Sequence, residues 1–189
     1  MKFNYTLGML VVLVALMTYV IAFERSPQEA TLDASTAAKA NILAQDAEAV
    51  QALEVDQNAP SVSIALQRGE DKNWVFADGQ PADAERIALL LTRLSPWQAA
   101  EVLFENQSEV QLADFGLEPP ALIMRLKTAT GTETVHIGNK TPTSSGYYVR
   151  RDGDPRIYLA YVNVPEDLER LVAEPPVPSA SPAAAAQPQ

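Results

Sequence analysis

Residues 61–76 read SVSIALQRGEDKNWVF, and the fold of the chain follows from this stretch. Every second residue from Val62 to Leu66 is apolar, and its neighbours are small or polar. This is the period of a strand with one buried face. Residues 69–73 form a polar turn, after which residues 74–76 resume the apolar pattern. The stretch therefore predicts a β-hairpin.

Downstream of this hairpin the apolar period changes to that of a helix. Four large apolar residues fall at positions i, i+3, i+4 and i+7, which places them on one helical stripe: Ile87, Leu90, Leu91 and Leu94. Asp83 is a typical N-cap, and Pro96 ends the helix. Residues 101–104 then have the composition of a short strand.

Strand patterns return in the second half of the chain, over residues 122–127, 134–137, 147–151 and 156–161. Pro165 then opens a second short helix with an apolar stripe. The total is about seven or eight strands and two helices, joined mostly by hairpin-length links. This pattern predicts an α+β fold with a mainly antiparallel sheet, because alternating βαβ units are missing.

An apolar run, LGMLVVLVALMTYVIAF, occupies residues 7–23 and contains no charge. With the two residues before it, a helix there would span roughly 28 Å, close to the ~30 Å hydrocarbon core of a bilayer. Lys2 precedes the run. A basic residue on this side of the run favours residues 1–6 in the cytoplasm and the residues after the run outside it. We therefore predict a single-pass inner-membrane anchor at residues 7–23. Cleavage of a signal peptide after Ala22 is the alternative, and the run is longer than an ordinary signal-peptide core.

The segments flanking the folded part have little apolar character. Residues 24–41 are rich in Ala, Ser, Thr and Glu and are expected to be a spacer. Residues 175–189 are rich in Pro and Ala and are expected to be a disordered tail. The predicted domain therefore spans residues 42–174.

The overall composition excludes several classes of protein. The 24 acidic and 14 basic side chains give a net charge of −10, which argues against binding to nucleic acid. The chain has no Cys, so disulfides, thiol nucleophiles, iron–sulfur clusters and zinc–thiolate sites are excluded. No residue pattern indicates a cofactor or a bound metal.

One region of this acidic chain is basic. Residues 121–160 contain six basic residues and only three acidic ones. The six basic residues form a candidate docking surface for an acidic partner or for lipid headgroups. They are Arg125, Lys127, Lys140, Arg150, Arg151 and Arg156.

Residues with catalytic potential are few. His136 is the only histidine, and the strand period points it away from the core, toward solvent or a sheet edge. No nucleophile and base are recognisable as a set, so we predict that the protein is not an enzyme. The alternative is a carboxylate-based envelope hydrolase that uses pairs among Asp114, Glu118, Asp152 and Asp154. The last two are also spaced like calcium ligands, but a turn explains them better.

Several short sequence landmarks follow one another over about residues 46–161. They are Trp74, Ala82-Asp83, Phe115-Gly116-Leu117-Glu118-Pro119-Pro120, Ile137-Gly138, Gly146-Tyr147-Tyr148-Val149-Arg150 and Ile157-Tyr158-Leu159. In this order the chain resembles the DUF4340 family of bacterial proteins, although Phe115 stands where the family often has Tyr. The resemblance implies an N-terminal membrane anchor, an extracytoplasmic domain and genetic association with ABC-type transporters of the gliding-motility kind. It supplies no catalytic residues.

These observations lead to one functional expectation. The protein is expected to be a membrane-tethered, extracytoplasmic protein-interaction module, accessory to an ABC-type transporter or an envelope complex. The alternatives are the carboxylate-based hydrolase and a passive structural spacer between the membrane and the envelope.

Overall fold

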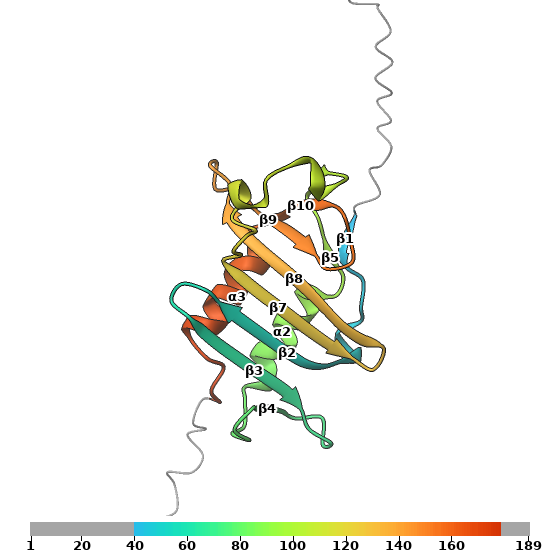
Figure 1. Ribbon diagram of the computed structural model, residues 1–189. Helices are drawn as coiled ribbons and strands as arrows, with labels where there is room; N and C mark the ends of the chain where they lie inside the picture. Colours follow the sequence, from blue (N-terminus) through green and yellow to red (C-terminus); the bar gives the residue numbers. More distant parts are fainter. Residues whose placement is uncertain (1–39, 179–189) are drawn as a thin grey trace, which may run out of the picture. The chain divides into compact units, whose positions relative to one another are not determined.

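The alternating strand patterns fold into an antiparallel sheet, and the two helical stripes pack on one of its faces (Figure 1). The computed structural model describes residues 40–178. The strands are β1 (Asn41–Leu43), β2 (Val50–Gln57), β3 (Val62–Arg68), β4 (Trp74–Phe76), β5 (Trp97–Gln98), β6 (Glu101–Phe104), β7 (Leu122–Thr128), β8 (Gly131–Lys140), β9 (Gly146–Arg151) and β10 (Ile157–Tyr161). The helices are α2 (Ala84–Leu94) and α3 (Asn163–Ala173), with short 3-10 turns η1 (Ala47–Ala49), η2 (Gln107–Glu109) and η3 (Leu112–Phe115).

The main sheet has eight strands in the order β4-β3-β2-β7-β8-β9-β10-β6. All neighbouring strands in it run antiparallel. Most neighbours are consecutive in sequence, because short turns join antiparallel strands as hairpins. The predicted α+β class, with a mainly antiparallel sheet and two helices, is confirmed.

A second, two-stranded sheet was not predicted. β1 pairs with β5 away from the main sheet. Both strands are too short to show an apolar period, and their pairing joins segments more than fifty residues apart in the chain. Ile42 and Leu43 of β1 and Trp97 of β5 are buried in the same core as the main sheet, so tertiary packing accounts for this pair.

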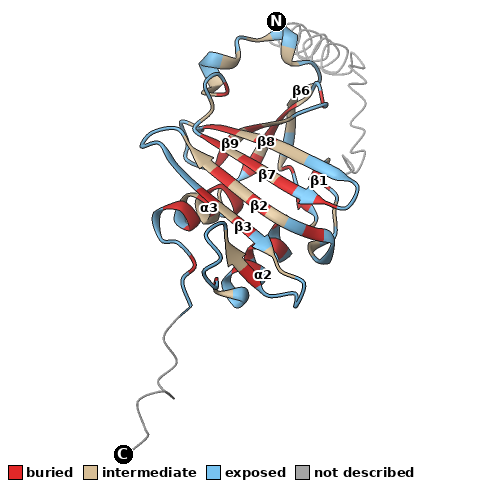
Figure 2. Cartoon of the chain, turned by 60° about the horizontal axis from the view of Figure 1, so that its bottom comes forward, coloured by how far each residue is buried: buried red, intermediate tan, exposed pale blue. Residues whose placement is uncertain are grey.

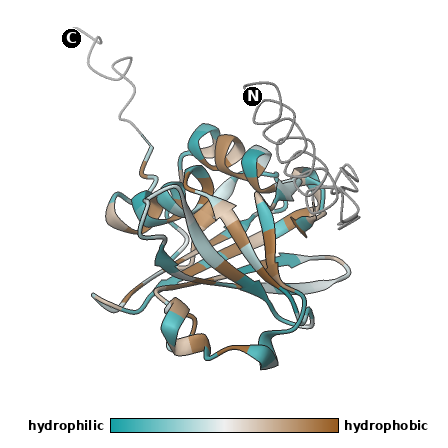
Figure 3. Ribbon diagram, turned by 90° about the horizontal axis from the view of Figure 1, so that it is seen from above, coloured by the Kyte–Doolittle hydropathy of each residue, from teal (hydrophilic) through white to brown (hydrophobic). Residues whose placement is uncertain are grey.

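The core lies between one face of the main sheet and the two helices. Along β7, Leu122, Met124 and Leu126 are buried, while the residues between them are partly or fully exposed. Figure 2 shows this alternation along the central strands, and Figure 3 shows the helices together on one side of the sheet. Because successive side chains of a strand point to opposite faces, the second face of the sheet is left to polar residues.

The helix α2 matches its prediction closely. The side chain of Asp83 accepts hydrogen bonds from the backbone N–H groups of Glu85 and Arg86, each over 3.1 Å. These bonds satisfy donors that the first turn of a helix leaves free. The predicted apolar stripe is buried, and the helix ends at Leu94, before Pro96.

The C-terminal helix continues into a short ordered extension. α3 begins at Asn163, two residues before the proline that predicted it, and its apolar stripe is buried. After the helix, the backbone oxygen of Pro176 accepts a hydrogen bond from the N–H of Asp83 over 2.7 Å. The first residues of the predicted tail therefore contact the start of α2.

Several predicted segments lie outside the described residues. They are the cytoplasmic residues 1–6, the anchor at residues 7–23, the spacer up to residue 39 and the tail from residue 179. Within residues 40–178, none of the helices has the length and apolar content needed to span a bilayer. The described part of the predicted spacer includes Asn41, the first residue of β1.

Candidate functional site

The face of the main sheet opposite the helices carries most of the polar side chains that strands can offer a partner. We call it the open face and define it by five residues on four neighbouring strands: Glu54, Asp56, Arg125, His136 and Arg150. Cross-strand register brings them together, because Glu54 lies opposite Arg125 and His136 lies opposite Arg150. Polar and charged side chains from four neighbouring strands thus share one face of the sheet.

Arg125 is the centre of the first charge cluster on the open face. One guanidinium nitrogen pairs with the Asp56 carboxylate and lies 3.4 Å from Oε1 of Glu54. Burial alone would raise the pKa of Asp56, but hydrogen bonds from Ser63 and Arg125 outweigh it and hold that pKa below its ordinary value. Two carboxylates on β2 therefore compensate the charge of Arg125.

His136 lies in a second cluster. Its side chain points away from the core, as the strand period predicted, but the predicted position in solvent or at a sheet edge is wrong. β8 is an interior strand, and the His136 side chain is only 12% exposed. Its Nε2 lies 2.9 Å from Oδ1 of Asp152, which also accepts a hydrogen bond from Arg150 over 3.3 Å. Sequence reasoning left this histidine without a partner because Asp152 reaches it only through the pairing of β8 with β9.

The protonation state of His136 follows from these surroundings. Burial and the positive charge of Arg150 lower the pKa of His136, and they outweigh the opposing effect of Asp152. In the neutral ring, Nε2–H donates to Asp152, since an ionised carboxylate only accepts. Nδ1 is buried without a hydrogen-bond partner among the described residues. Within residues 40–178, the hydrogen bond of the ring is therefore the one to Asp152.

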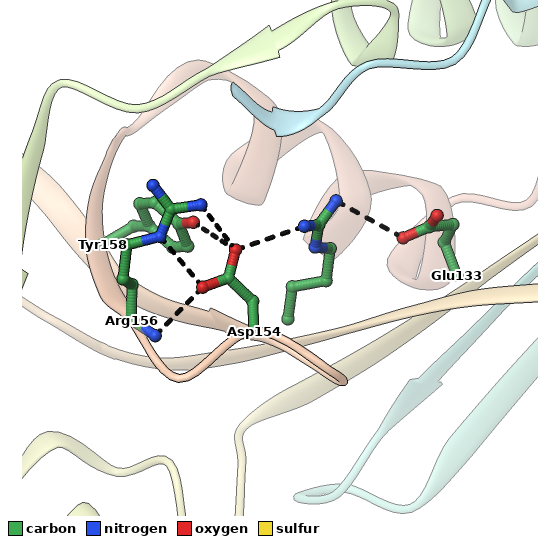
Figure 4. Close-up of polar contacts among 5 residues, drawn as sticks. Glu133, Asp154, Arg156 and Tyr158 are labelled. Atoms are coloured by element: carbon green, nitrogen blue, oxygen red, sulfur yellow. Dashed lines mark hydrogen bonds and ion pairs between the residues drawn. The ribbon is translucent and has the colours of Figure 1, made fainter. Parts of the chain in front are cut away.

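Asp154, two residues further along the turn, faces the opposite side of the sheet (Figure 4). The residue is 5% exposed, and its carboxylate accepts hydrogen bonds from Arg151 (3.1 Å), Arg156 (2.8 and 2.9 Å) and the hydroxyl of Tyr158 (2.6 Å). The hydrogen bonds from Arg156, helped by that of Tyr158, hold the pKa of Asp154 well below its usual range. Burial and the neighbouring carboxylate raise the pKa of Tyr158 to about 12.

The carboxylates proposed for a hydrolase do not share one element. Asp114 lies in η3, and Glu118 lies in the link to β7. Asp152 and Asp154 share a turn but bind different partners on opposite faces. A carboxylic acid that donates a proton needs a raised pKa, whereas the pKa of Asp154 is lowered. Within residues 40–178, no three His, Asp or Glu side chains are placed to hold a metal ion together.

The six residues of the predicted docking surface are divided between two sides of the sheet. Arg125, Lys127 and Arg150 lie on the open face, because alternate residues of a strand share a face. Lys140, Arg151 and Arg156 do not lie on the open face. Arg151 and Arg156 bind Asp154, and the ammonium of Lys140 lies 2.7 Å from Glu166 of α3 and over the ring of Tyr147.

Lys127 differs from the other five. They all form ion pairs, whereas Lys127 has no carboxylate within 4.0 Å in the described part of the chain. It lines a hollow of about 440 Å³ on the open face. Ala52 of β2 lies opposite Gln67 and Ala65 of β3 lies opposite Glu54, so the two alanines are diagonal neighbours in the lining. Their small side chains leave this space beside Gln67 and Lys127.

The segment at residues 107–115 covers the other end of the open face. Its last residue, Phe115, packs edge-on against Tyr148 of β9 at 4.9 Å and against Phe104 of β6 at 5.6 Å between ring centroids. Gly138 of β8 permits this approach, because a Cβ there would overlap the carbonyl oxygen of Phe115. None of the residues of this segment lines the hollow, so the hollow lies outside the covered end.

The fold and the open face define a class of protein: an α+β domain whose main antiparallel sheet is covered by helices on one side. A family model for a domain of unknown function, DUF4340, matches residues 74–174, which is more than half of the chain. The chain belongs to this family, as its sequence landmarks suggested. No curated protein and no solved structure matches it.

Proposed function

We propose that the protein is a membrane-tethered, extracytoplasmic interaction module that binds a protein partner in the cell envelope, as an accessory of an ABC-type transporter or another envelope complex. The observation that carries this proposal is the open face. It presents a hollow with small residues in its lining, a lysine ammonium without a carboxylate partner in the described chain, and exposed ion pairs.

The chemistry of the open face suits a protein partner. Ion pairs near the surface contribute little to stability, so their charges can be redirected to a partner at low cost. Arg125 and Arg150 belong to the open face, and arginine is enriched in protein interfaces. A partner carrying carboxylates would compensate Lys127, whose charge the described chain leaves unmatched.

The proposed tether is supported by the sequence. Residues 7–23 form an uncharged apolar run of the length that crosses a bilayer, and a basic residue precedes it. The following domain would then lie in the extracytoplasmic space as a single-pass protein of the inner membrane.

Protease treatment of intact spheroplasts tests the location. A chain with a C-terminal epitope should lose that epitope on external protease treatment, while a cytoplasmic control protein stays intact. Recovery of the intact chain from treated spheroplasts, or of the whole chain in the soluble fraction, would refute the tether.

Crosslinking in native membranes tests the docking surface. The wild-type chain should capture a discrete envelope partner, and Lys127→Glu should reduce that capture because it places a carboxylate against an acidic partner. Lys72→Glu is the matched control, since it makes the same charge change in the exposed β3–β4 turn. Equal capture by wild type and Lys127→Glu would refute docking at this hollow.

A further inference from the structure

The outer surface of the helix pair carries a second feature, separate from the open face. A groove of about 190 Å³ runs between α2 and α3. We call it the helix groove and define it by Arg86, Leu89 and Arg93 of α2 and by Asp167 and Arg170 of α3. Three arginines and one acidic residue thus line a groove on a chain whose net charge is −10.

The charges of the helix groove are incompletely compensated. Arg93 and Arg170 both pair with the single carboxylate of Asp167. Arg86 donates to the backbone oxygens of Glu174 and Pro175, which carry no net charge. The side chains of Arg93 and Arg170 are 52% and 61% exposed, so both guanidinium groups remain accessible to a partner.

The other acidic residues at the middle of α3 are directed elsewhere. Glu166 pairs with Lys140 of β8 at 2.7 Å. Glu169 accepts a hydrogen bond from the hydroxyl of Tyr147 of β9 over 3.1 Å. The helix therefore has an acidic side facing β8 and β9, and a side facing α2 on which Asp167 is shared between two arginines.

An apolar side chain lies within this positive surface. Leu89 is 59% exposed, whereas its neighbour Leu90 is buried. Arg86 and Arg93 stand three residues before and four residues after Leu89, so all three share one face of α2. Arginine is enriched in protein interfaces, and the exposed side chain of Leu89 adds an apolar contact between the two guanidinium groups.

We propose that the helix groove binds an acidic amphipathic segment of a partner protein. An apolar side chain of the segment packs on Leu89, and its carboxylates pair with Arg93 and Arg170. A second copy of this chain fits poorly, because a two-fold contact would set the arginines of one groove against those of the other. A bilayer surface fits poorly too, since one exposed leucine provides little apolar area to insert.

Peptide selection on the full-length chain, purified in mild detergent, tests this inference. Short random peptides displayed on phage are selected on the wild-type chain, and the enriched peptides are labelled and titrated by fluorescence anisotropy. The enriched peptides should be rich in Asp and Glu and contain a large apolar residue. Leu89→Asp and Arg170→Glu should each weaken their binding by about tenfold or more, since both remove a central contact.

Two controls make the result specific. Lys127→Glu, on the open face, should leave peptide binding unchanged, and circular dichroism should show that all variants are folded. Peptides without acidic residues, no enrichment, or equal binding to Leu89→Asp would overturn the inference. A lipid surface would be favoured instead if the chain floated with phosphatidylglycerol vesicles in a way that depends on Leu89 and no acidic peptides were selected. That result would overturn the inference. Because Leu89→Asp and Arg170→Glu leave the open face unchanged, their failure to weaken binding leaves the proposed docking at Lys127 standing.

Discussion

Tyr158 donates its hydroxyl hydrogen to Oδ2 of Asp154 over 2.6 Å, and this bond holds the β9–β10 turn against the buried side of the sheet. Arg151, the last residue of β9, and Arg156, just before β10, complete the contact. A carboxylate buried this deeply is tolerated only because its oxygens are fully occupied by donors. The cluster is therefore a structural lock on the last hairpin.

Removal of the Asp154 carboxylate should destabilise the fold strongly. We expect Asp154→Ala to lower the free energy of unfolding by about 3 kcal/mol, because it leaves the Arg156 guanidinium and the buried Tyr158 hydroxyl without their acceptor. Urea unfolding of the full-length chain, followed by circular dichroism, measures the change. Asp152→Ala is the matched control in the same turn, where the side chain is 54% exposed, and it should cost less than about 1 kcal/mol. Equal losses for the two variants would contradict the lock.

The same carboxylate should make stability depend on acid pH. Because the folded pKa of Asp154 lies below the unfolded value, its ionisation stabilises the fold above about pH 4, and this contribution is lost as the pH falls further. The difference in free energy of unfolding between the wild type and Asp154→Asn should therefore become smaller below about pH 4. Urea unfolding of both proteins at a series of acid pH values measures this difference. A difference that does not change with pH would argue against a lowered pKa of Asp154.

His136 should impose a separate pH dependence near neutrality. Its folded pKa lies below the ordinary value of about 6.5, so the unfolded chain takes up a proton first as the pH falls. Wild-type stability should thus decrease as the pH falls below about 6.5, and His136→Gln should remove this component. The chain has one histidine, so its ring signal in a proton NMR titration reports the folded pKa directly. A midpoint at or above the ordinary value would contradict the burial argument.

Gly138 should be essential for the segment that covers one end of the open face. A Cβ in Gly138→Ala would overlap backbone atoms of Phe115 and Gly116, so residues 107–115 must move off β8. We expect faster proteolytic cleavage within this segment and a loss of stability of about 1–3 kcal/mol. Gly79→Ala is the control: its new Cβ meets nothing within 4 Å, and it should leave cleavage of residues 107–115 unchanged.

Local patterns along the chain were sufficient to predict both helices and most strands of the main sheet, but not β1 and β5. The hairpin at residues 61–76, the buried stripe of α2 and its Asp83 cap all depend on neighbours within a few residues, and all three are confirmed. Family membership was predictable for a related reason, because the landmarks from Trp74 onward are short segments in a recognisable order.

Contacts between distant strands were not predictable in this way. The candidate docking residues Arg150 and Arg151 are adjacent in the chain, yet one binds Asp152 on the open face and the other binds Asp154 on the opposite face. His136 gains its carboxylate partner from sixteen residues away, and the arginines of the helix groove come from helices more than seventy residues apart. Strand and helix periods depend on the nearest neighbours of each residue, whereas the partner of each charge depends on register and helix packing, which are settled when the whole chain folds.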